Sequence, residues 1–316
     1  MVEHRAVADT GIELSRVVLG GGNFGGVGSA PEWFGKGESD EDAFGIMDAA
    51  WALGITAFDT ADAYGGGRSE RAIGAWMRAT GNRPTLTTKT FNPMTAEGDS
   101  GLSRPRVVRQ LESSLERLGV ESVDLYLAHD FDADTPLEET VATFEGLVGT
   151  GLIKAWGVSN FNAAQLRATL ALARPAVVQN SYSLLDRRDE EDVIPLCVDF
   201  DVAYEAYSPL AGGWLTGKYQ RDETPPADSR MTQRPEPYEH LRTDAVFAGL
   251  DELRSRASSR GIELAALALA WVLSHPAVTA VVTGPRRPEH LVPAVAALAT
   301  ALTADDRTEL ASLLPV

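Results

Sequence analysis

Short apolar runs rich in β-branched residues alternate along the chain with longer segments in which apolar residues recur every three or four positions. The runs predict strands at 17–20, 55–58, 85–89, 123–127, 153–158, 177–180, 201–206 and 279–282. The longer segments predict helices near 39–53, 69–79, 104–118, 137–149, 162–173, 190–199, 244–259, 263–274 and 288–299. Continuously apolar runs such as 176–178 and 280–282 are typical of strands covered on both faces, and therefore of a parallel sheet. Repeated strand-then-helix units predict a closed (β/α)₈ TIM barrel, with residues 1–316 as a single domain.

Two segments fall outside this alternation. Residues 7–16 carry the turn sequence Asp9-Thr10-Gly11 between short alternating segments, which predicts a β-hairpin that caps the barrel. The longest interruption runs from 207 to about 241, after the seventh strand, and its second half is polar and rich in proline. Long loops at the carboxyl end of a barrel strand are usually functional, so we expect a role for its first half. The alternative, a disordered surface excursion, fits the second half better than the first.

Composition restricts the classes of partner. The chain has 45 acidic and 28 basic residues and a formal net charge of −17, which repels phosphate backbones and anionic membrane surfaces. Neither nucleic acid nor a membrane is therefore an expected partner. The single cysteine, Cys197, cannot form an internal disulfide and lies in an apolar helical run, so we interpret it as a core residue. Without a signal-like or membrane-length apolar run, the sequence predicts a soluble cytoplasmic protein.

Three segments match the spacing of known motifs but lack another feature that each motif requires. Residues 20–25 match the dinucleotide pattern GxGxxG, but no helix begins inside the motif, so we interpret it as a loop that lets a ligand approach the backbone. Residues 130–134 resemble a calcium loop, yet Thr135 replaces its turn glycine and Val141 its glutamate. Residues 157–161 resemble a nucleophile elbow without the final glycine. We therefore predict no metal site and no serine hydrolase.

Polar residues end three neighbouring strands of the predicted barrel. The second strand ends in Asp59, the third in Lys89 and the fourth in His129, and Tyr64 lies in the loop after Asp59. Ser69 is expected to be the N-cap of the helix that follows this loop. Barrels place their chemistry at the carboxyl ends of strands. Any one of these side chains has an ordinary structural explanation, but together they predict a functional site.

This set of side chains suits general acid catalysis. A Tyr64 hydroxyl has an unperturbed pKa of about 10, which we expect the Lys89 ammonium to lower. Asp59 would keep Lys89 protonated and in position, and His129 would donate a hydrogen bond to a substrate carbonyl. Such a site protonates an alkoxide as it forms. The accompanying hydride cannot come from a side chain, so a nicotinamide cofactor is implied.

Seven segments resemble motifs of the aldo-keto reductase superfamily, in the family's order and over nearly the whole chain. They are residues 58–65, 88–90, 124–129, 157–161, 179–183, 207–213 and 284–289. The resemblance implies a barrel with an N-terminal hairpin and NADPH-dependent reduction of an aldehyde or ketone to an alcohol. It also implies that Tyr64 is the general acid, supported by Asp59, Lys89 and His129.

The resemblance further implies a cofactor site. Ser159, Asn160 and Gln179 would bind the nicotinamide carboxamide, and Tyr207 would stack on the ring. The pyrophosphate would lie along the segment 208–218 and the adenosine end after Gly284. The complete predicted set is Gly22, Asn23, Asp59, Ser159, Asn160, Gln179, Tyr207, Ser208, Pro209, Leu210, Gly212, Lys218, Gly284, Arg286, Arg287 and His290.

The adenosine end of this predicted site departs from the family pattern. Arg286 or Arg287 would face the 2′-phosphate of NADP, since arginine suits charge-assisted pairs with phosphate. Related reductases commonly carry Gln, Glu and Asn where this chain has His290, Pro293 and Ala294. The side-chain contacts to adenine are therefore expected to be missing or replaced.

Two alternatives stay open. The potassium-channel β subunits share this fold and retain a cofactor site, so a regulatory subunit is the competing function. A narrower alternative is a reductase of ketosugars or secondary-metabolite ketones, with Trp33, Phe34 and Trp214 as an aromatic wall for a sugar or ring. The sequence indicates a small-molecule carbonyl substrate without specifying its identity, the direction of the reaction or the oligomeric state.

Overall fold

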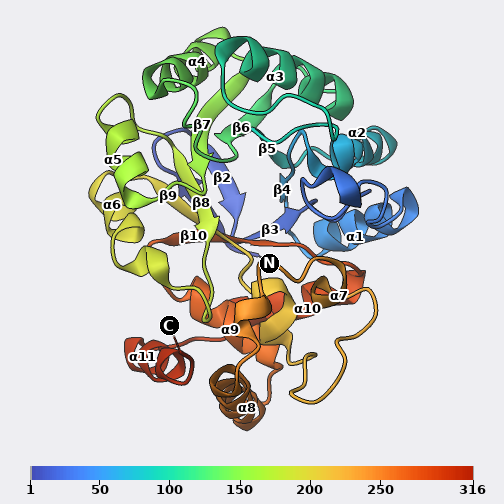
Figure 1. The fold of residues 1–316 in the computed structure, drawn as a ribbon, viewed down its shortest axis with the longest axis vertical. Helices are drawn as coiled ribbons and strands as arrows, with labels where there is room; N and C mark the ends of the chain where they lie inside the picture. The colour runs from blue at the N-terminus through green and yellow to red at the C-terminus, as the bar shows by residue number, and fades with distance from the viewer. Residues whose placement is uncertain (1, 316) are drawn as a thin grey trace.

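Eight parallel strands close into a barrel in the computed structural model, which describes residues 2–315 (Figure 1). Their spatial order is β10-β3-β4-β5-β6-β7-β8-β9, with β10 pairing with both β3 and β9. The bounds are β3 Val17–Gly20, β4 Ala57–Asp59, β5 Thr85–Thr90, β6 Val123–Ala128, β7 Ile153–Ser159, β8 Val177–Ser181, β9 Ala203–Tyr207 and β10 Val278–Thr283. The predicted (β/α)₈ barrel is confirmed, and each predicted strand is present with its bounds shifted by at most a few residues.

An antiparallel hairpin covers one end of the barrel, as predicted. Strand β1 (His4–Val7) pairs with β2 (Ile12–Ser15). Val7, Ile12 and Leu14 are buried together with apolar residues of the barrel strands. These apolar contacts close the amino-terminal end of the barrel, so that the opposite, carboxyl-terminal end remains for a site.

Helices surround the barrel (Figure 1). They are α1 Asp40–Ala52, α2 Arg68–Thr80, α3 Arg104–Leu118, α4 Leu137–Thr150, α5 Ala163–Leu170, α6 Val193–Asp199, α7 Arg230–Gln233, α8 Asp244–Ser259, α9 Leu264–Leu273, α10 Val292–Leu298 and α11 Ala304–Ser312. The sequence did not predict α7 or α11. Helix α11 buries Leu310 but few other side chains, so its apolar periodicity is weak. Within residues 2–315, no helix has both the length and the apolar character needed to cross a membrane.

The start of α2 differs from the prediction. Gly67, with φ +81°, is the N-cap, and the three glycines at 65–67 all have positive φ. This left-handed path suits glycine, and it places the N-cap of the helix two residues earlier than expected. Ser69 instead turns inward, where its hydroxyl lies 2.8 Å from that of Thr60. Its prediction as an N-cap was wrong.

The loop after β9 is folded over the barrel rather than disordered. It contains a 3₁₀ segment, Ala211–Thr216, followed later by α7 and a second 3₁₀ turn, Glu239–Leu241. Arg230 of α7 donates to the Asn23 side chain, and Arg286 donates to the backbone oxygen of Asp228. These contacts tie the second half of the loop to the segments after β3 and β10. The interpretation of that half as a disordered excursion was therefore wrong.

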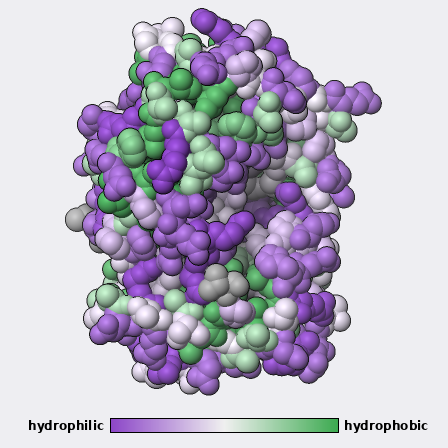
Figure 2. Space-filling model, turned by 60° about the vertical axis from the view of Figure 1, so that its left-hand side comes forward, coloured by the Kyte–Doolittle hydropathy of each residue, from purple (hydrophilic) through white to green (hydrophobic). Residues whose placement is uncertain are grey.

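Hydrophilic residues cover most of the face drawn in Figure 2, as expected for a chain with a net charge of −17. Cys197 is 1% exposed and packs in the core, as predicted. The barrel interior is apolar toward the hairpin and becomes polar toward the carboxyl ends of the strands, where Asp59, Lys89 and Gln179 are buried. This cluster of buried polar groups, two of them charged, marks the carboxyl end as the candidate site.

Candidate active site

A cleft of about 1990 Å³ opens at the carboxyl ends of the barrel strands and beneath the loop after β9. The predicted site residues that line it are Gly22, Asn23, Asp59, Tyr64, His129, Ser159, Asn160, Gln179, Tyr207, Ser208, Pro209, Leu210, Gly212, Lys218, Gly284, Arg286 and His290. Lys89 lies fully buried beneath it, and Arg287 is exposed outside it. The structure thus brings nearly all the predicted residues to one cavity, with Arg287 as the exception.

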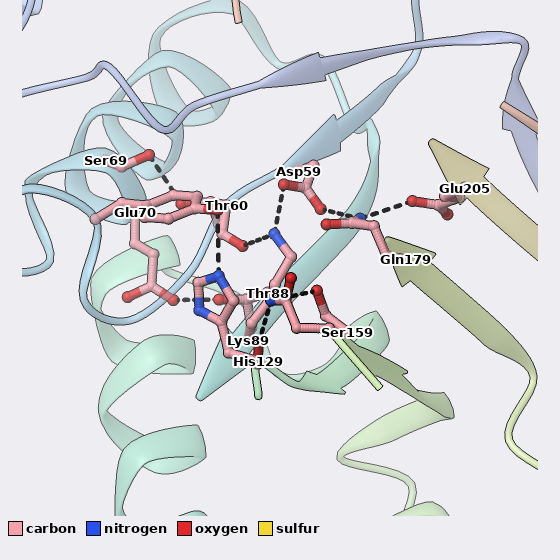
Figure 3. Close-up of polar contacts among 12 residues, drawn as sticks. Asp59, Thr60, Ser69, Glu70, Thr88, Lys89, His129, Ser159, Gln179 and Glu205 are labelled. Atoms are coloured by element: carbon pink, nitrogen blue, oxygen red, sulfur yellow. Dashed lines mark hydrogen bonds and ion pairs between the residues drawn. The ribbon is translucent and has the colours of Figure 1, made fainter. Parts of the chain in front are cut away.

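An ion pair lies at the floor of this cleft (Figure 3). The Lys89 ammonium donates to Asp59 Oδ1 over 2.5 Å and to the backbone oxygen of Thr60 over 3.0 Å. Both charged side chains are almost completely buried. A carboxylate at a strand end requires a cation or several donors, and Lys89 is the partner that the sequence suggested for Asp59.

Tyr64 and His129 face each other above this pair. The Tyr64 hydroxyl lies 3.4 Å from His129 Nε2, and the Lys89 ammonium lies 5.1 Å from the centre of the Tyr64 ring. Burial raises the pKa of Tyr64, and the Asp59 carboxylate adds to this effect, while the Lys89 ammonium opposes it. The lowering effect predicted for Lys89 is present, but burial outweighs it, so the net pKa of Tyr64 lies above its ordinary value instead of below it. Tyr64 therefore keeps its proton at neutral pH.

Asn92 fixes the tautomer of His129, and the sequence analysis missed it. The Asn92 side-chain amide donates to His129 Nδ1 over 3.3 Å. Burial, reinforced by the Lys89 ammonium, holds the pKa of His129 well below its usual range, so the imidazole is neutral. Because Nδ1 accepts a hydrogen bond, the remaining proton is on Nε2, the nitrogen that faces the cleft. His129 is therefore a hydrogen-bond donor toward the cleft.

A second carboxylate joins the floor of the site and was also missed. Gln179 Nε2 donates to Asp59 Oδ2 over 2.8 Å and to Glu205 Oε2 over 2.8 Å (Figure 3). Glu205 lies on β9 and is fully buried. Because both amide hydrogens of Gln179 are engaged, its side-chain oxygen is the group left to face the cleft.

Asn160 and Tyr207 form the next wall of the cleft. The Tyr207 hydroxyl donates to Asn160 Oδ1 over 2.6 Å, and Asn160 Nδ2 donates to the backbone oxygen of His129 over 2.8 Å. Asn160 has φ +63° and Ser208 has φ +51°, values that are uncommon for residues other than glycine. Backbone strain of this kind persists where surrounding contacts hold it, and it is frequent at functional sites.

The far end of the cleft is cationic, although the protein is acidic. Lys218, Arg230 and Arg286 all line it, and burial, reinforced by the two arginines, lowers the pKa of Lys218. Beside them the backbone is tightly packed: a Cβ at Gly212, where φ is +62°, would meet the Tyr238 ring at 2.5 Å. A cluster of cations along a close backbone segment fits an anionic ligand such as a pyrophosphate. Arg230 lies in the proline-rich stretch, which gave no signal of a site.

The predicted aromatic wall is absent. Trp214 is 2% exposed and packs against Tyr219 and Phe247, with ring centroids 5.2 and 5.4 Å away. Trp33 lies beside the Lys36 ammonium. None of the three predicted aromatic residues, all within the described part of the chain, lines the cleft. Trp214 therefore anchors the loop after β9 to the core.

Comparison with known proteins supports one family. The model of the aldo/keto reductase family matches residues 16–315. A probable voltage-gated potassium channel subunit beta of Oryza sativa subsp. japonica is 34% identical over 279 residues, which cover 84% of this chain and 84% of that protein. The aldo-keto reductase YhdN of Bacillus subtilis (strain 168) is 31% identical over 317 residues, which cover 99% of this chain and 94% of that protein.

The solved structures include a close match in fold. The glycerol dehydrogenase from Gluconobacter oxydans is 29% identical, with a TM-score of 0.83, and the match covers 96% of this chain and 92% of that one. Since the family model spans almost the whole chain and these relatives share both its length and its barrel, the chain belongs to the aldo/keto reductase family.

Proposed function

We propose that this protein is an NADPH-dependent oxidoreductase that reduces an aldehyde or ketone to an alcohol, with Tyr64 as the general acid. The observation that carries the proposal is the position of the Tyr64 hydroxyl, which lies in the cleft 3.4 Å from His129 Nε2 and above the buried Lys89–Asp59 pair. A proton donor, a hydrogen-bond donor and a fixed positive charge meet at one point, which suits a carbonyl oxygen that becomes negative.

The protein's own residues would act as follows. The carbonyl oxygen of the substrate would accept hydrogen bonds from the Tyr64 hydroxyl and from His129 Nε2. As negative charge develops on that oxygen, the Tyr64 proton moves to it, and the Lys89 ammonium stabilises the resulting phenolate. An alkoxide is a far stronger base than a phenolate, so the raised pKa of Tyr64 still permits this transfer. Asp59 keeps Lys89 charged and in place.

The cofactor, when bound, supplies the hydride. Ser159, Asn160 and the side-chain oxygen of Gln179 would hold the nicotinamide carboxamide, and Tyr207 would stack on the ring. The orientation of the Gln179 amide, fixed by two carboxylates, supports this role because it leaves an acceptor toward the cleft. The pyrophosphate-containing middle of the cofactor would lie along Gly22, Asn23 and residues 208–212.

The cationic cluster favours NADPH over NADH. The phosphates would be held by Lys218, Arg230 and Arg286. Three cations suit NADPH better than NADH, because NADPH carries an additional 2′-phosphate. The Arg286 guanidinium is already paired with Glu38 over 2.5 Å, so Arg230 is the arginine that we assign to the cofactor most directly.

A regulatory subunit is the second candidate, because relatives from plants and fission yeast are named potassium channel subunits. The assembled Tyr64, His129, Lys89 and Asp59 geometry favours the enzyme. A ketosugar substrate retains support from the polar residues Asn92 and Asp130, which line the cleft beside His129, and no longer from an aromatic wall. The single free cysteine suits a reducing, cytoplasmic location.

The testing experiment is an NADPH-oxidation assay over a panel of aldehydes, ketones and ketosugars, with glycerol and other alcohols assayed in the reverse direction. Turnover of at least one class is expected. NADPH binding without turnover of any compound would support the regulatory subunit. Absence of NADPH binding would contradict both functions.

A further inference from the structure

Glu205 occupies an unusual position for a carboxyl group. It lies on β9 inside the barrel, is fully buried, and does not line the cleft. Its Oε2 accepts from Gln179 over 2.8 Å, while Oε1 accepts no hydrogen bond from any residue of the described range 2–315 (Figure 3). One glutamine side chain separates this carboxyl group from the cleft.

The floor of the site holds two carboxyl groups and one ammonium. Glu205 is paired in register with Gln179 on β8 and with Ala280 on β10, both uncharged, and the charged groups that act on it are Asp59 and Lys89. Burial, together with the Asp59 carboxylate, raises the pKa of Glu205 to about 7. Asp59 already neutralises Lys89, so an ionised Glu205 adds a negative charge that no cation of residues 2–315 balances.

This added charge distinguishes the two redox states of a nicotinamide. The ring is positively charged when oxidised and neutral when reduced, whereas the remainder of the cofactor is the same in both states. A buried negative charge stabilises a nearby positive ring and has little effect on a neutral one.

We propose that Glu205 makes the protein prefer the oxidised cofactor, and that this preference strengthens as the pH rises through neutrality. The inference rests on the proposed nicotinamide site. By linkage, binding of the oxidised cofactor favours ionisation of Glu205 and releases a proton near neutral pH. Acidic conditions therefore favour the reduced cofactor and carbonyl reduction, and alkaline conditions favour alcohol oxidation.

The test measures dissociation constants of NADP⁺ and NADPH for the full-length protein by calorimetry, between about pH 6 and pH 8.5. The ratio of the NADP⁺ constant to the NADPH constant should fall by about tenfold over this range, as expected for one charge gained within the site. In Glu205→Gln the ratio should be independent of pH, with NADP⁺ weakened by about tenfold at pH 8.5 and NADPH within about twofold. Glu112→Gln, which removes an exposed charge on α3, should behave like the unmutated protein.

The ratio cancels every group that acts only on the shared phosphates and adenosine, and comparison with Glu205→Gln separates Glu205 from Tyr64, the other acid beside the ring. A flat ratio in the unmutated protein, or an unchanged pH dependence in Glu205→Gln, would overturn the inference. Equal weakening of both cofactors would assign Glu205 a purely structural role and overturn it too. If Glu205→Gln does not fold, the ratio in Tyr64→Phe decides, because this variant keeps Glu205 and removes the other acid that could ionise beside the ring; a pH dependence lost in Tyr64→Phe would overturn the inference. Failure of the unmutated protein to bind either cofactor would instead reject the proposed function itself.

Discussion

Lys89 and Asp59 form an ion pair 2.5 Å long in which neither side chain is more than 2% exposed. Burial lowers the pKa of Lys89, but the Asp59 carboxylate and the Tyr64 hydroxyl outweigh it, so the net pKa lies above its ordinary value. Such a pair contributes little net stability, because desolvation offsets its attraction. Its consequence is a lysine that stays protonated, and so remains a hydrogen-bond donor, beneath Tyr64.

Removal of one partner should cost more than removal of both. We expect Lys89→Met to lower the free energy of unfolding by about 3–5 kcal/mol, because Asp59 would stay buried without its cation. The double variant Asp59→Asn, Lys89→Met should recover most of that loss. Denaturant unfolding of the three proteins measures the difference, and equal losses in the single and double variants would contradict it.

Replacement of the proposed general acid should separate chemistry from binding. Tyr64→Phe should lower carbonyl reduction by at least about a hundredfold, since general acid catalysis typically contributes at least this much. NADPH affinity, measured by fluorescence titration, should stay nearly constant. Reduction that persisted within about tenfold of the unmutated protein would reject Tyr64 as the acid.

Asn92 should act through the tautomer of His129. Asn92→Asp places a carboxylate where the amide donated, which favours a proton on Nδ1 and raises the pKa of His129. The acidic limb of the pH profile of kcat/KM should then move upward by about one pH unit. Asn92→Leu should lower kcat without this shift. Arg106 holds the backbone oxygen of Asn92 over 2.8 Å, which limits the change to the side chain. An unmoved profile would exclude the tautomer role.

Arginine substitutions should distinguish the cleft from the surface. We expect Arg230→Met to weaken NADPH by about tenfold or more, because a buried charge-assisted contact would be lost. Arg287→Met, at an exposed position outside the cleft, is the matched control and should change NADPH affinity by no more than about twofold. Fluorescence titration of both variants with NADPH and NADH measures these effects. A larger loss in Arg287→Met would restore the original prediction for that residue.

The parts of the site that could be predicted from the sequence are the ones that end buried strands. Asp59, Lys89 and His129 interrupt apolar runs, and a parallel barrel brings such ends to one rim. Glu205 carried a usable signal, since it is a charged residue within the apolar run 201–206. It was missed because the predicted site was built from residues at strand ends, and Glu205 lies within a strand. Arg230 carried none, because only the folded loop brings it to Asn23.

Packing decided the remaining differences. The pKa of Tyr64 depends on how completely the loop after β4 is buried, which strand ends alone do not specify. Ser69 is a good N-cap residue by type, but three consecutive glycines start the helix before it. Trp214 is an aromatic residue of the kind that can line a substrate site, but it packs in the core instead. In each case a tertiary contact overrides a local preference.

Asp62 should make stability depend on pH. Its side chain is fully buried. Thr90 donates a hydrogen bond to Oδ2 over 2.6 Å, whereas Oδ1 has no hydrogen-bond partner among residues 2–315. Burial raises the pKa of Asp62 to about 7. Between about pH 4 and pH 7 the unfolded chain therefore loses this proton while the folded protein keeps it, so the folded state loses stability as the pH rises through this window.

The substitution Asp62→Asn should remove this dependence. The free energy of unfolding of the variant minus that of the unmutated protein should increase by roughly 3 kcal/mol from pH 5 to pH 8. The reason is that the unmutated protein loses stability over about two pH units of differential protonation, and the variant does not. Asp305→Asn, at an exposed position of α11, should show no such change. Urea unfolding at the two pH values measures both differences. An equal difference at both would show that Asp62 ionises in the folded protein as easily as in the unfolded chain, and that Thr90 and the backbone already satisfy the charge.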